Sequence, residues 1–215
     1  MVDIRKATLT DIPFLTEVII ETEKSGTDIL SYSTIFGMEL SEVQEAIAQM
    51  LDEEIDHCEY AVSAFMIAEE DGKALGAICA WVEAAEDIPS STLKGNLLRF
   101  TINKENFERA IALNPIIREV HLEYIPGTVQ VGLVYITPGA RGKGLVKMLL
   151  DAQLERLKAE HPEAEEVYLQ VFGNNEAAIK SYKKLGFNVV ETKKATTPKI
   201  TQYLPCDTKM LMKLN

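Results

Sequence analysis

The sequence lacks the features that define several classes of protein. Its three cysteines, Cys58, Cys79 and Cys206, are far apart, and there is no C-x-x-C pair or His/Cys cluster of the zinc-binding kind. No apolar run approaches the roughly 20 residues that span a bilayer, and the N-terminal MVDIRKATL has no apolar core of the signal-peptide type. Sparse cysteine is typical of a reducing compartment. We therefore expect a cytoplasmic protein with no metal and no membrane partner.

Positive charge is also scarce. The chain has 22 Lys and Arg against 33 Asp and Glu, a formal net charge of −11, which repels nucleic acid and anionic membrane surfaces. No Lys or Arg occurs between Lys24 and Lys73, and acidic residues crowd the first part of that window. These are Asp28, Glu39, Glu42, Glu45, Asp52, Glu53, Glu54, Asp56 and Glu59. Two interpretations stay open: solvated faces of helices and loops, or an acidic rim that attracts a cationic partner.

The length fits one domain, or one domain with an insertion, and the apolar patterns predict both strands and helices. A chain of 215 residues with 47% hydrophobic content can bury a sizeable core. The first half predicts a strand over 2–8, a helix that begins near Thr10 or Asp11, a helix over 41–55 with a Ser41-x-x-Gln44 capping box, and a hairpin of 59–68 and 75–82 around Asp71-Gly72. The C-terminal part predicts strands over 188–193 and 209–214.

The most informative stretch runs from Val131 to Glu191. An apolar run over 131–136 ends at Pro138-Gly139, and Arg141-Gly142-Lys143-Gly144 leads into a helical pattern with apolar residues at steps of three and four. The free N–H groups of a helix N-terminus attract anions, glycines let a phosphate approach, and Arg141 and Lys143 add charge. The alternative is a glycine turn that binds nothing.

The second half of this stretch contains further matching motifs. A strand pattern over 167–172 is followed by Asn174-Asn175, a helix over 176–185 and Gly186-Phe187. With these residues the chain resembles the GNAT superfamily of N-acetyltransferases, which use acetyl-coenzyme A. The resembling residues are Pro138, Arg141, Gly144, Asn175-x-x-Ala178-Ile179-x-x-Tyr182 and Leu185-Gly186-Phe187. One departure is Val146, where the family's R-x-x-G-x-G/A turn has a small residue.

The resemblance implies an α/β (α+β) fold with a mixed, mostly antiparallel central sheet flanked by helices. It implies a single domain over 1–215, with an acetyl-coenzyme A binding core over 131–191. Residues 84–127, with two helical patterns interrupted by Pro115, Pro126 and Gly127, are too long for a simple loop. We interpret them as a helical insertion that builds or covers the acceptor site, or that packs against another subunit, which leaves a homodimer open.

The resemblance also assigns roles to residues. It implies that the cofactor's pyrophosphate binds the turn, that its pantetheine arm binds the end of the strand, and that Asn175 contacts the same arm; Asn175 can equally serve as a helix N-cap. Tyr182 matches the tyrosine that protonates the departing thiolate, and its alternative is a core aromatic. The cofactor-binding residues expected in the strand and turn are Val134, Tyr135, Ile136, Arg141, Gly142, Lys143, Gly144, Leu145 and Val146.

No general base is assigned by a motif. The strand residues 129–136 contain no acid, and the nearest candidates, Glu83 and Glu123, have no motif behind them. His121 is a further candidate base, although a lone histidine at a strand start is more often structural. A chain of waters can also serve this role.

The function that these observations favour is transfer of an acetyl group from acetyl-coenzyme A to a primary amine, by direct attack of the amine on the thioester. One alternative is an acyl-coenzyme A binding regulatory module without turnover. Another is a protein–protein module that uses the glycine turn only as structure.

Overall fold

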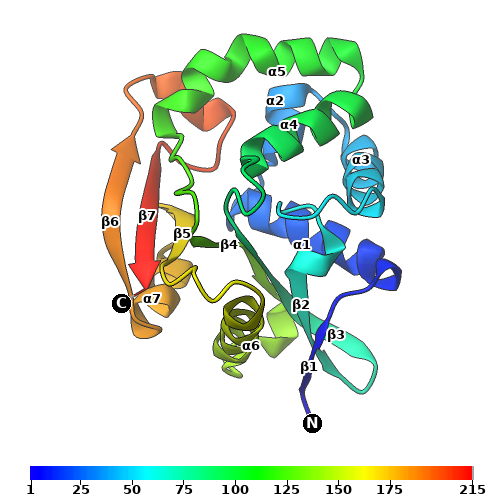
Figure 1. Cartoon of the computed structure of the whole chain (residues 1–215). Helices are drawn as coiled ribbons and strands as arrows, with labels where there is room; N and C mark the ends of the chain where they lie inside the picture. The colour runs from blue at the N-terminus through cyan, green and yellow to red at the C-terminus, as the bar shows by residue number, and fades with distance from the viewer. Residues whose placement is uncertain (215) are drawn as a thin grey trace.

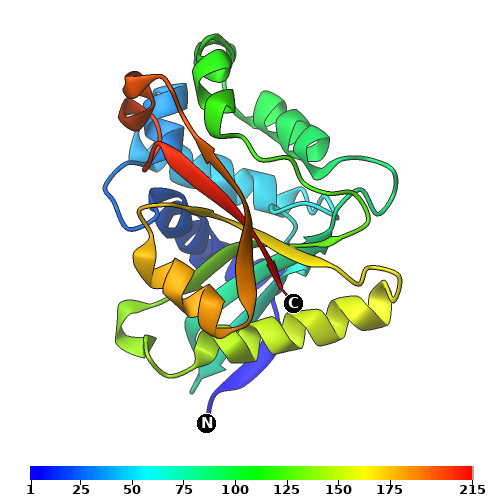
Figure 2. The same ribbon diagram turned by 90° about the vertical axis from the view of Figure 1, so that its left-hand side faces the viewer.

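The structure is a computed structural model that describes residues 1–214. It has one seven-stranded sheet with helices on both faces (Figures 1 and 2). The strands are β1 Asp3–Lys6, β2 Phe65–Glu70, β3 Lys73–Val82, β4 Val129–Ile136, β5 Val167–Phe172, β6 Phe187–Lys194 and β7 Thr208–Leu214. The helices are α1 Ile12–Lys24, α2 Ser31–Phe36, α3 Leu40–Asp52, α4 Ser90–Thr101, α5 Lys104–Ile117, α6 Leu145–Glu160 and α7 Glu176–Lys184. None of the helices in the described part combines the length and apolar character of a membrane span.

The sheet has the order β1-β2-β3-β4-β5-β7-β6. Every pairing within the described sheet is antiparallel except that of β4 with β5. This arrangement confirms the expected mixed, mostly antiparallel sheet flanked by helices. The parallel pair of β4 and β5 lies at the centre of the sheet, so a gap in its pairing opens the middle of the molecule.

Two irregularities open the sheet at its centre. The parallel pairing of β4 with β5 covers only Val129–Val131 against Val167–Leu169. In addition, β4 has one more residue than β3 between Val131 and Val134, which is a β-bulge. Past Val131, the edge of β4 that faces β5 therefore has no strand partner.

The two faces of the sheet bury separate apolar clusters. One cluster packs α1 and α3 against the sheet and includes Leu15, Ile47 and Phe65. The other packs α6 and includes Leu149 and Phe187. Figure 2 shows α6 and α7 on one side of the twisted sheet and α1–α5 on the other. The residues of 84–127 thus belong to the α1 side, where α5 crosses the top of the molecule above α2, α3 and α4 (Figure 1).

The predicted hairpin forms, but its first arm is shorter than expected. Asp71 and Gly72 have φ angles of 52° and 75°, the left-handed conformations that a two-residue type I′ turn requires. Strand β2 begins only at Phe65, and residues 59–64 form a loop that ends in a short 3₁₀ turn. The expectation of a strand from residue 59 was wrong. The apolar residues there are buried, as they would be in a strand, but they belong to a loop that packs in the core beside the sheet.

Three helix details also differ from expectation. Helix α3 begins at Leu40, and its capping box is formed by Glu39 and Glu42 instead of Ser41 and Gln44. Helix α5 continues through Pro115 to Ile117; in the last turn a proline removes one backbone hydrogen bond, which a helix end tolerates more easily than a helix middle. Helix α2 was not predicted, because six residues are too few for a periodic pattern.

A tryptophan supports the bulged part of β4. Trp81 is 2% exposed, and its Nε1 donates a hydrogen bond to Glu83, 2.9 Å away. Its ring also meets Tyr124 edge-on, with 5.4 Å between ring centroids. A Cβ atom on Gly132 would lie 2.7 Å from Cζ3 of Trp81, so the glycine is required by a close approach. This environment makes Trp81 a packing residue.

We predict that Gly132→Ala destabilises the protein, because the tryptophan is held on both sides and has no room to move. Overpacking of this kind costs about 1–3 kcal/mol, which lowers the melting temperature of a chain of this size by roughly 2–12 °C. Gly95→Ala is the control: it lies inside α4 with no atom within 4 Å of the added Cβ, and it should leave the melting temperature unchanged or raise it. Equal melting temperatures for Gly132→Ala and the native chain would contradict this packing.

Candidate functional site

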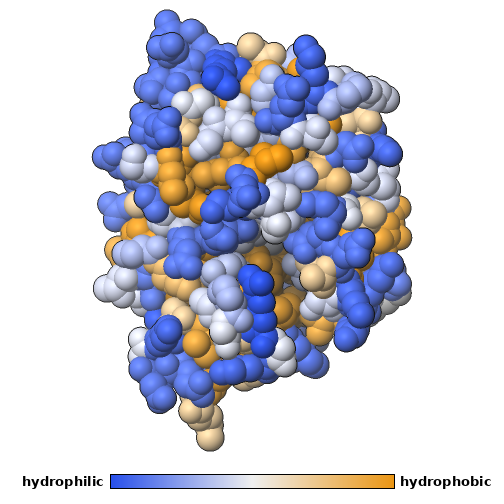
Figure 3. Space-filling view, turned by 180° about the vertical axis from the view of Figure 1, so that it is seen from behind, coloured by the Kyte–Doolittle hydropathy of each residue, from blue (hydrophilic) through white to orange (hydrophobic). Residues whose placement is uncertain are grey.

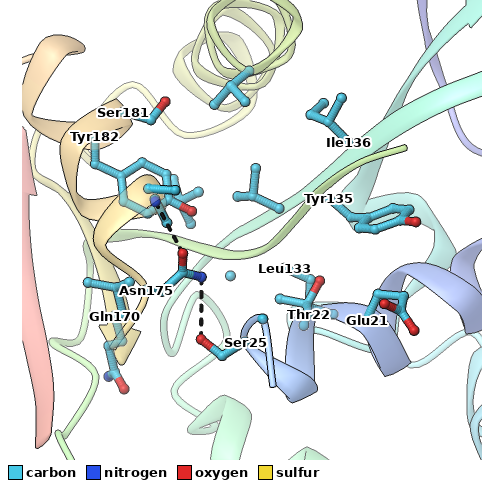
Figure 4. Close-up of a pocket in the computed structure, with 18 of the residues that line it drawn as sticks. Glu21, Thr22, Ser25, Leu133, Tyr135, Ile136, Gln170, Asn175, Ser181 and Tyr182 are labelled. Atoms are coloured by element: carbon cyan, nitrogen blue, oxygen red, sulfur yellow. Dashed lines mark hydrogen bonds between the residues drawn. The ribbon is translucent and has the colours of Figure 1, made fainter. Parts of the chain in front are cut away.

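A cavity of about 900 Å³ opens where β4 and β5 separate. Its walls come from β4, the glycine turn and start of α6, the end of β5, α7 and the C-terminal end of α1. Figure 3 shows the molecule from behind, with apolar residues at the bottom of hollows in a largely hydrophilic surface. Elements that are far apart in the sequence therefore meet around one space (Figure 4).

The two glycines of the turn have left-handed backbone conformations. Gly142 and Gly144 have φ angles of 81° and 75°, and Gly144 is the N-cap of α6. No atom lies within 4 Å of a Cβ built on either residue, so backbone conformation and not crowding explains these glycines. The unpaired N–H groups of the first turn of α6 are thus beside open space, which suits an anion.

Two basic residues of the turn differ in position. Arg141 lines the cavity, and its Nε donates to the carbonyl of Ile136 across 3.3 Å. No carboxylate of the described residues lies within 4.0 Å of its guanidinium. Lys143 is about half exposed and its Nζ lies 4.0 Å from Glu70. Its side chain is outside the cavity lining.

The cavity brings together most of the residues expected to hold a cofactor. Besides Arg141, its lining includes Val134, Tyr135, Ile136, Gly142, Gly144, Leu145, Val146, Asn175 and Tyr182. The phenol of Tyr135 lies 3.1 Å from Glu17 and points away from Tyr182 (Figure 4). Val146 is partly buried with the α6 cluster and still borders the open space.

Asn175 links α7 to the end of α1. Its Oδ1 accepts from the N–H of Ala178 at 3.1 Å, so it is the N-cap of α7. Its Nδ2 lies 3.3 Å from Oγ of Ser25, and Figure 4 shows this contact across the cavity. Ser25 has a left-handed backbone, with φ of 47°, and ends α1. The expected N-cap role is therefore present, and the amide also positions the wall opposite.

Tyr182 lies on α7 at the cavity. Its ring meets that of Phe187 edge-on at 6.0 Å, which fixes the ring against the α6 side of the sheet. Burial raises the pKa of its hydroxyl to about 12. The hydroxyl therefore keeps its proton at neutral pH and is a donor.

None of the three sequence candidates for a general base lies at the cavity. Glu83 is 3% exposed and accepts hydrogen bonds from Trp81 and Ser90, so its role is structural. Glu123 is on the surface with 81% of its side chain exposed, next to His121 at 3.4 Å. The fold therefore places none of Glu83, Glu123 and His121 in the lining of the cavity.

The cavity lining contains seven charged residues that the motif analysis did not assign to it, and two of these, Lys147 and Lys184, lie on α6 and α7. Four of them, with one tyrosine, form what we call the polar end: Glu23, Glu59, Lys94, Tyr124 and Lys209. Outside the polar end, Glu21 is paired with Lys24 at 2.7 Å and Lys147 with Asp151 at 2.6 Å. Of the nine acidic residues named in the Lys/Arg-free window, only Glu59 lines this cavity. The window therefore does not form an acidic rim around it.

A buried polar network supports the polar end. Lys94 of α4 forms an ion pair with Glu59 and lies over the ring of Tyr60, 5.5 Å from its centroid. Tyr124 donates to Glu59 across 3.4 Å, and Tyr60 is hydrogen-bonded to Tyr32. Burial disfavours the charged form of Lys94, but the carboxylate of Glu59 outweighs it and holds the pKa of Lys94 well above its usual value. Lys94 is thus charged, and its charge is neutralised by Glu59.

The described residues contain no cluster of three or more His, Cys, Asp or Glu side chains arranged to hold a metal. The groups around the cavity are instead backbone N–H donors, the unpaired edge of β4, a partly buried phenol and separated charges. Such a set suits a long ligand with a phosphate at one end and amide groups along its length.

Comparison with known proteins agrees with this arrangement. The profile of the acetyltransferase (GNAT) family matches residues 36–187. No curated protein matches the chain. Among solved structures, an N-acetyltransferase from Staphylococcus aureus Mu50 superposes with a TM-score of 0.70 at 16% identity, over 99% of this chain and 100% of that one.

Two other solved structures share the fold at greater distance. A ribosomal-protein-alanine N-acetyltransferase from Brucella melitensis has a TM-score of 0.55 at 16% identity, over 98% of each chain. A PaiA N-acetyltransferase from Thermoplasma acidophilum, solved in complex with coenzyme A, has a TM-score of 0.51 at 15% identity, over 100% of this chain and 99% of that one. Because the family match covers more than half of the sequence, the protein belongs to the GNAT family of acetyltransferases and is an acyltransferase.

Proposed function

We propose that the protein transfers the acetyl group of acetyl-coenzyme A to a primary amine. The observation that carries this proposal is the cavity at the separation of β4 from β5, bordered at one side by the glycine turn and at the other by Tyr182. The GNAT-fold protein from Thermoplasma acidophilum was solved with coenzyme A, which supports the same cofactor here.

The donor side of the cavity supplies three kinds of contact. The free N–H groups at the start of α6 and the guanidinium of Arg141 would hold the pyrophosphate. The N–H and C=O groups on the unpaired edge of β4, over 132–136, would form hydrogen bonds with the amides of the pantetheine arm. The arm would then occupy the position of a neighbouring strand. One of its N–H groups would stabilise the oxyanion that forms when the amine attacks the thioester.

Tyr182 completes the chemistry as a proton donor. When the amine nitrogen bonds to the acetyl carbon, the C–S bond breaks and the sulfur leaves as a thiolate. The buried hydroxyl of Tyr182, protonated at neutral pH, would give its proton to that sulfur. The amine loses its own proton to water or to a carboxylate at the cavity.

The test of the proposal is release of free thiol from acetyl-coenzyme A over a panel of primary amines, followed with a thiol reagent. Acceleration by at least one amine, with the acetylated amine as product, supports it. Binding of acetyl-coenzyme A without turnover of any amine would favour a regulatory module instead.

Our first prediction here is that Gly144→Asp weakens the binding of acetyl-coenzyme A. The carboxylate would stand at the N-cap of α6, where the phosphates belong, and repulsion should weaken binding at least 10-fold in titration calorimetry. Gly127→Asp is the control, because Gly127 has a similar φ of 74° and open space but is outside the cavity. Gly127→Asp introduces a backbone strain similar to that of Gly144→Asp, but its affinity for acetyl-coenzyme A should equal that of the native protein. Native affinity in a folded Gly144→Asp variant would rule out the turn as the phosphate site.

A second prediction is that Tyr182→Phe lowers kcat by about 100- to 10,000-fold, the usual contribution of general acid catalysis. The ring and its packing on Phe187 remain, so KM for acetyl-coenzyme A should change little. Tyr168→Phe is the control: its hydroxyl is bonded to Glu166 at 2.9 Å, away from the cavity, and its removal should leave kcat unchanged. Undiminished turnover of Tyr182→Phe would show that Tyr182 is only a packing residue.

A further inference from the structure

The charged side chains of the polar end are not all paired with one another. Glu59 is neutralised by Lys94. Glu23 accepts a hydrogen bond from the hydroxyl of Ser31, and no cationic group of the described residues lies within 4.0 Å of it. Lys209 likewise has no carboxylate within 4.0 Å among residues 1–214. After the ion pair is set aside, one negative and one positive charge remain at the polar end.

Lys209 points into the cavity from β7. Side chains of a strand alternate between its two faces: Leu211, two residues on, packs with Leu122 and Tyr168 on the α5 side, whereas Met212 packs with the α6 cluster. Lys209 therefore shares the face of Leu211 and lies among the cavity-lining residues. Its Nζ is 5.5 Å from the ring centroid of Phe172, a weak interaction compared with an ion pair.

An uncompensated ammonium in such a place is unfavourable without a ligand. Lys209 is partly buried, and burial lowers its pKa below the usual value, while the carboxylates of Glu23 and Glu59 oppose that change and Lys94 adds to it. An anion brought beside Lys209 would relieve this cost and gain a charge-assisted hydrogen bond. The same anion would lie near Lys94, the other cation of the polar end.

We propose that Lys209 binds an anionic group of the acceptor, so that the acceptor carries a carboxylate or phosphate as well as its amine. The inference rests on the proposed amine acetylation and adds the class of acceptor. Glu23, the remaining carboxylate, is opposite in charge and attracts the ammonium form of the amine. A zwitterionic acceptor therefore matches the two charges that are left unpaired at the polar end.

The experiment compares kcat/KM for matched amines with and without the anionic group. One arm uses L-amino acids against their carboxamides, and a second uses glucosamine 6-phosphate against glucosamine, which separates a carboxylate from a phosphate. The native enzyme should prefer the anionic member of one arm by about 10- to 100-fold, the size of a charged hydrogen bond. Lys209→Met, which keeps the apolar stem, should remove that preference by slowing only the anionic member.

Lys213→Met is the matched control. Lys213 is on the same strand and face, but its Nζ is paired with Glu166 at the surface and it is outside the cavity lining. This variant loses the same charge from the protein and should keep the native preference. If kcat/KM of the neutral amine equals that of its anionic counterpart in both arms, the inference about the acceptor is overturned. The proposed amine acetylation would still hold in that case. Equal loss for both members in Lys209→Met would overturn it too.

Binding gives a readout that does not depend on turnover. If no amine of the panel is acetylated, the proposed reaction fails for these amines, and the same pairs are titrated into the protein saturated with coenzyme A. Tighter binding of the anionic member, lost in Lys209→Met and kept in Lys213→Met, supports the assignment of Lys209. Equal binding of both members, or no binding of either, overturns it.

Discussion

The separation of β4 from β5 beyond Val131 is the constraint on which the site depends. It leaves backbone N–H and C=O groups of residues 132–136 without a strand partner in the middle of the sheet. An unsatisfied buried backbone group costs about 1–3 kcal/mol, so water or a ligand must bind this edge. The bulge in β4 and the packing of Gly132 on Trp81 hold the strand in this shape. The fold thereby keeps an incomplete sheet that a ligand with peptide-like amides can complete.

The same opening divides the cavity chemically. On one side the glycine turn and the start of α6 provide N–H donors and Arg141, with no carboxylate within 4.0 Å of that guanidinium among the described residues. On the other side, α1, α4 and β7 provide carboxylates and ammonium groups that are only partly paired. Tyr182 and Asn175 lie along the wall that joins them. A chain whose net charge is −11 thus places positive charge where a polyphosphate would bind.

Sequence predicted the donor side much better than the polar end. The strand, glycine turn and helix that follow one another over 131–160 form one local unit, so the sequence pattern placed Gly144 and Arg141 at a helix start, and the resemblance to the family indicated what they could bind. Asn175 and Tyr182 were expected at the site from the resemblance, and both line the cavity. By contrast, Glu23, Lys94 and Lys209 come from α1, α4 and β7, and only the folded sheet brings them together. The candidate bases Glu83 and Glu123, which no motif supported, lie outside the cavity: Glu83 accepts a hydrogen bond from Trp81, and Glu123 lies on the surface.

Hydrogen–deuterium exchange of β4 tests the central claim most directly, because it reports on the unpaired edge itself. The protein is measured alone and with saturating acetyl-coenzyme A, with binding verified by calorimetry. The account predicts slower exchange of amides in residues 132–136 and 142–146 when the cofactor binds, and unchanged exchange in the β1–β2 pairing, which is remote from the cavity. Bound acetyl-coenzyme A with unchanged exchange over 132–136 would contradict it.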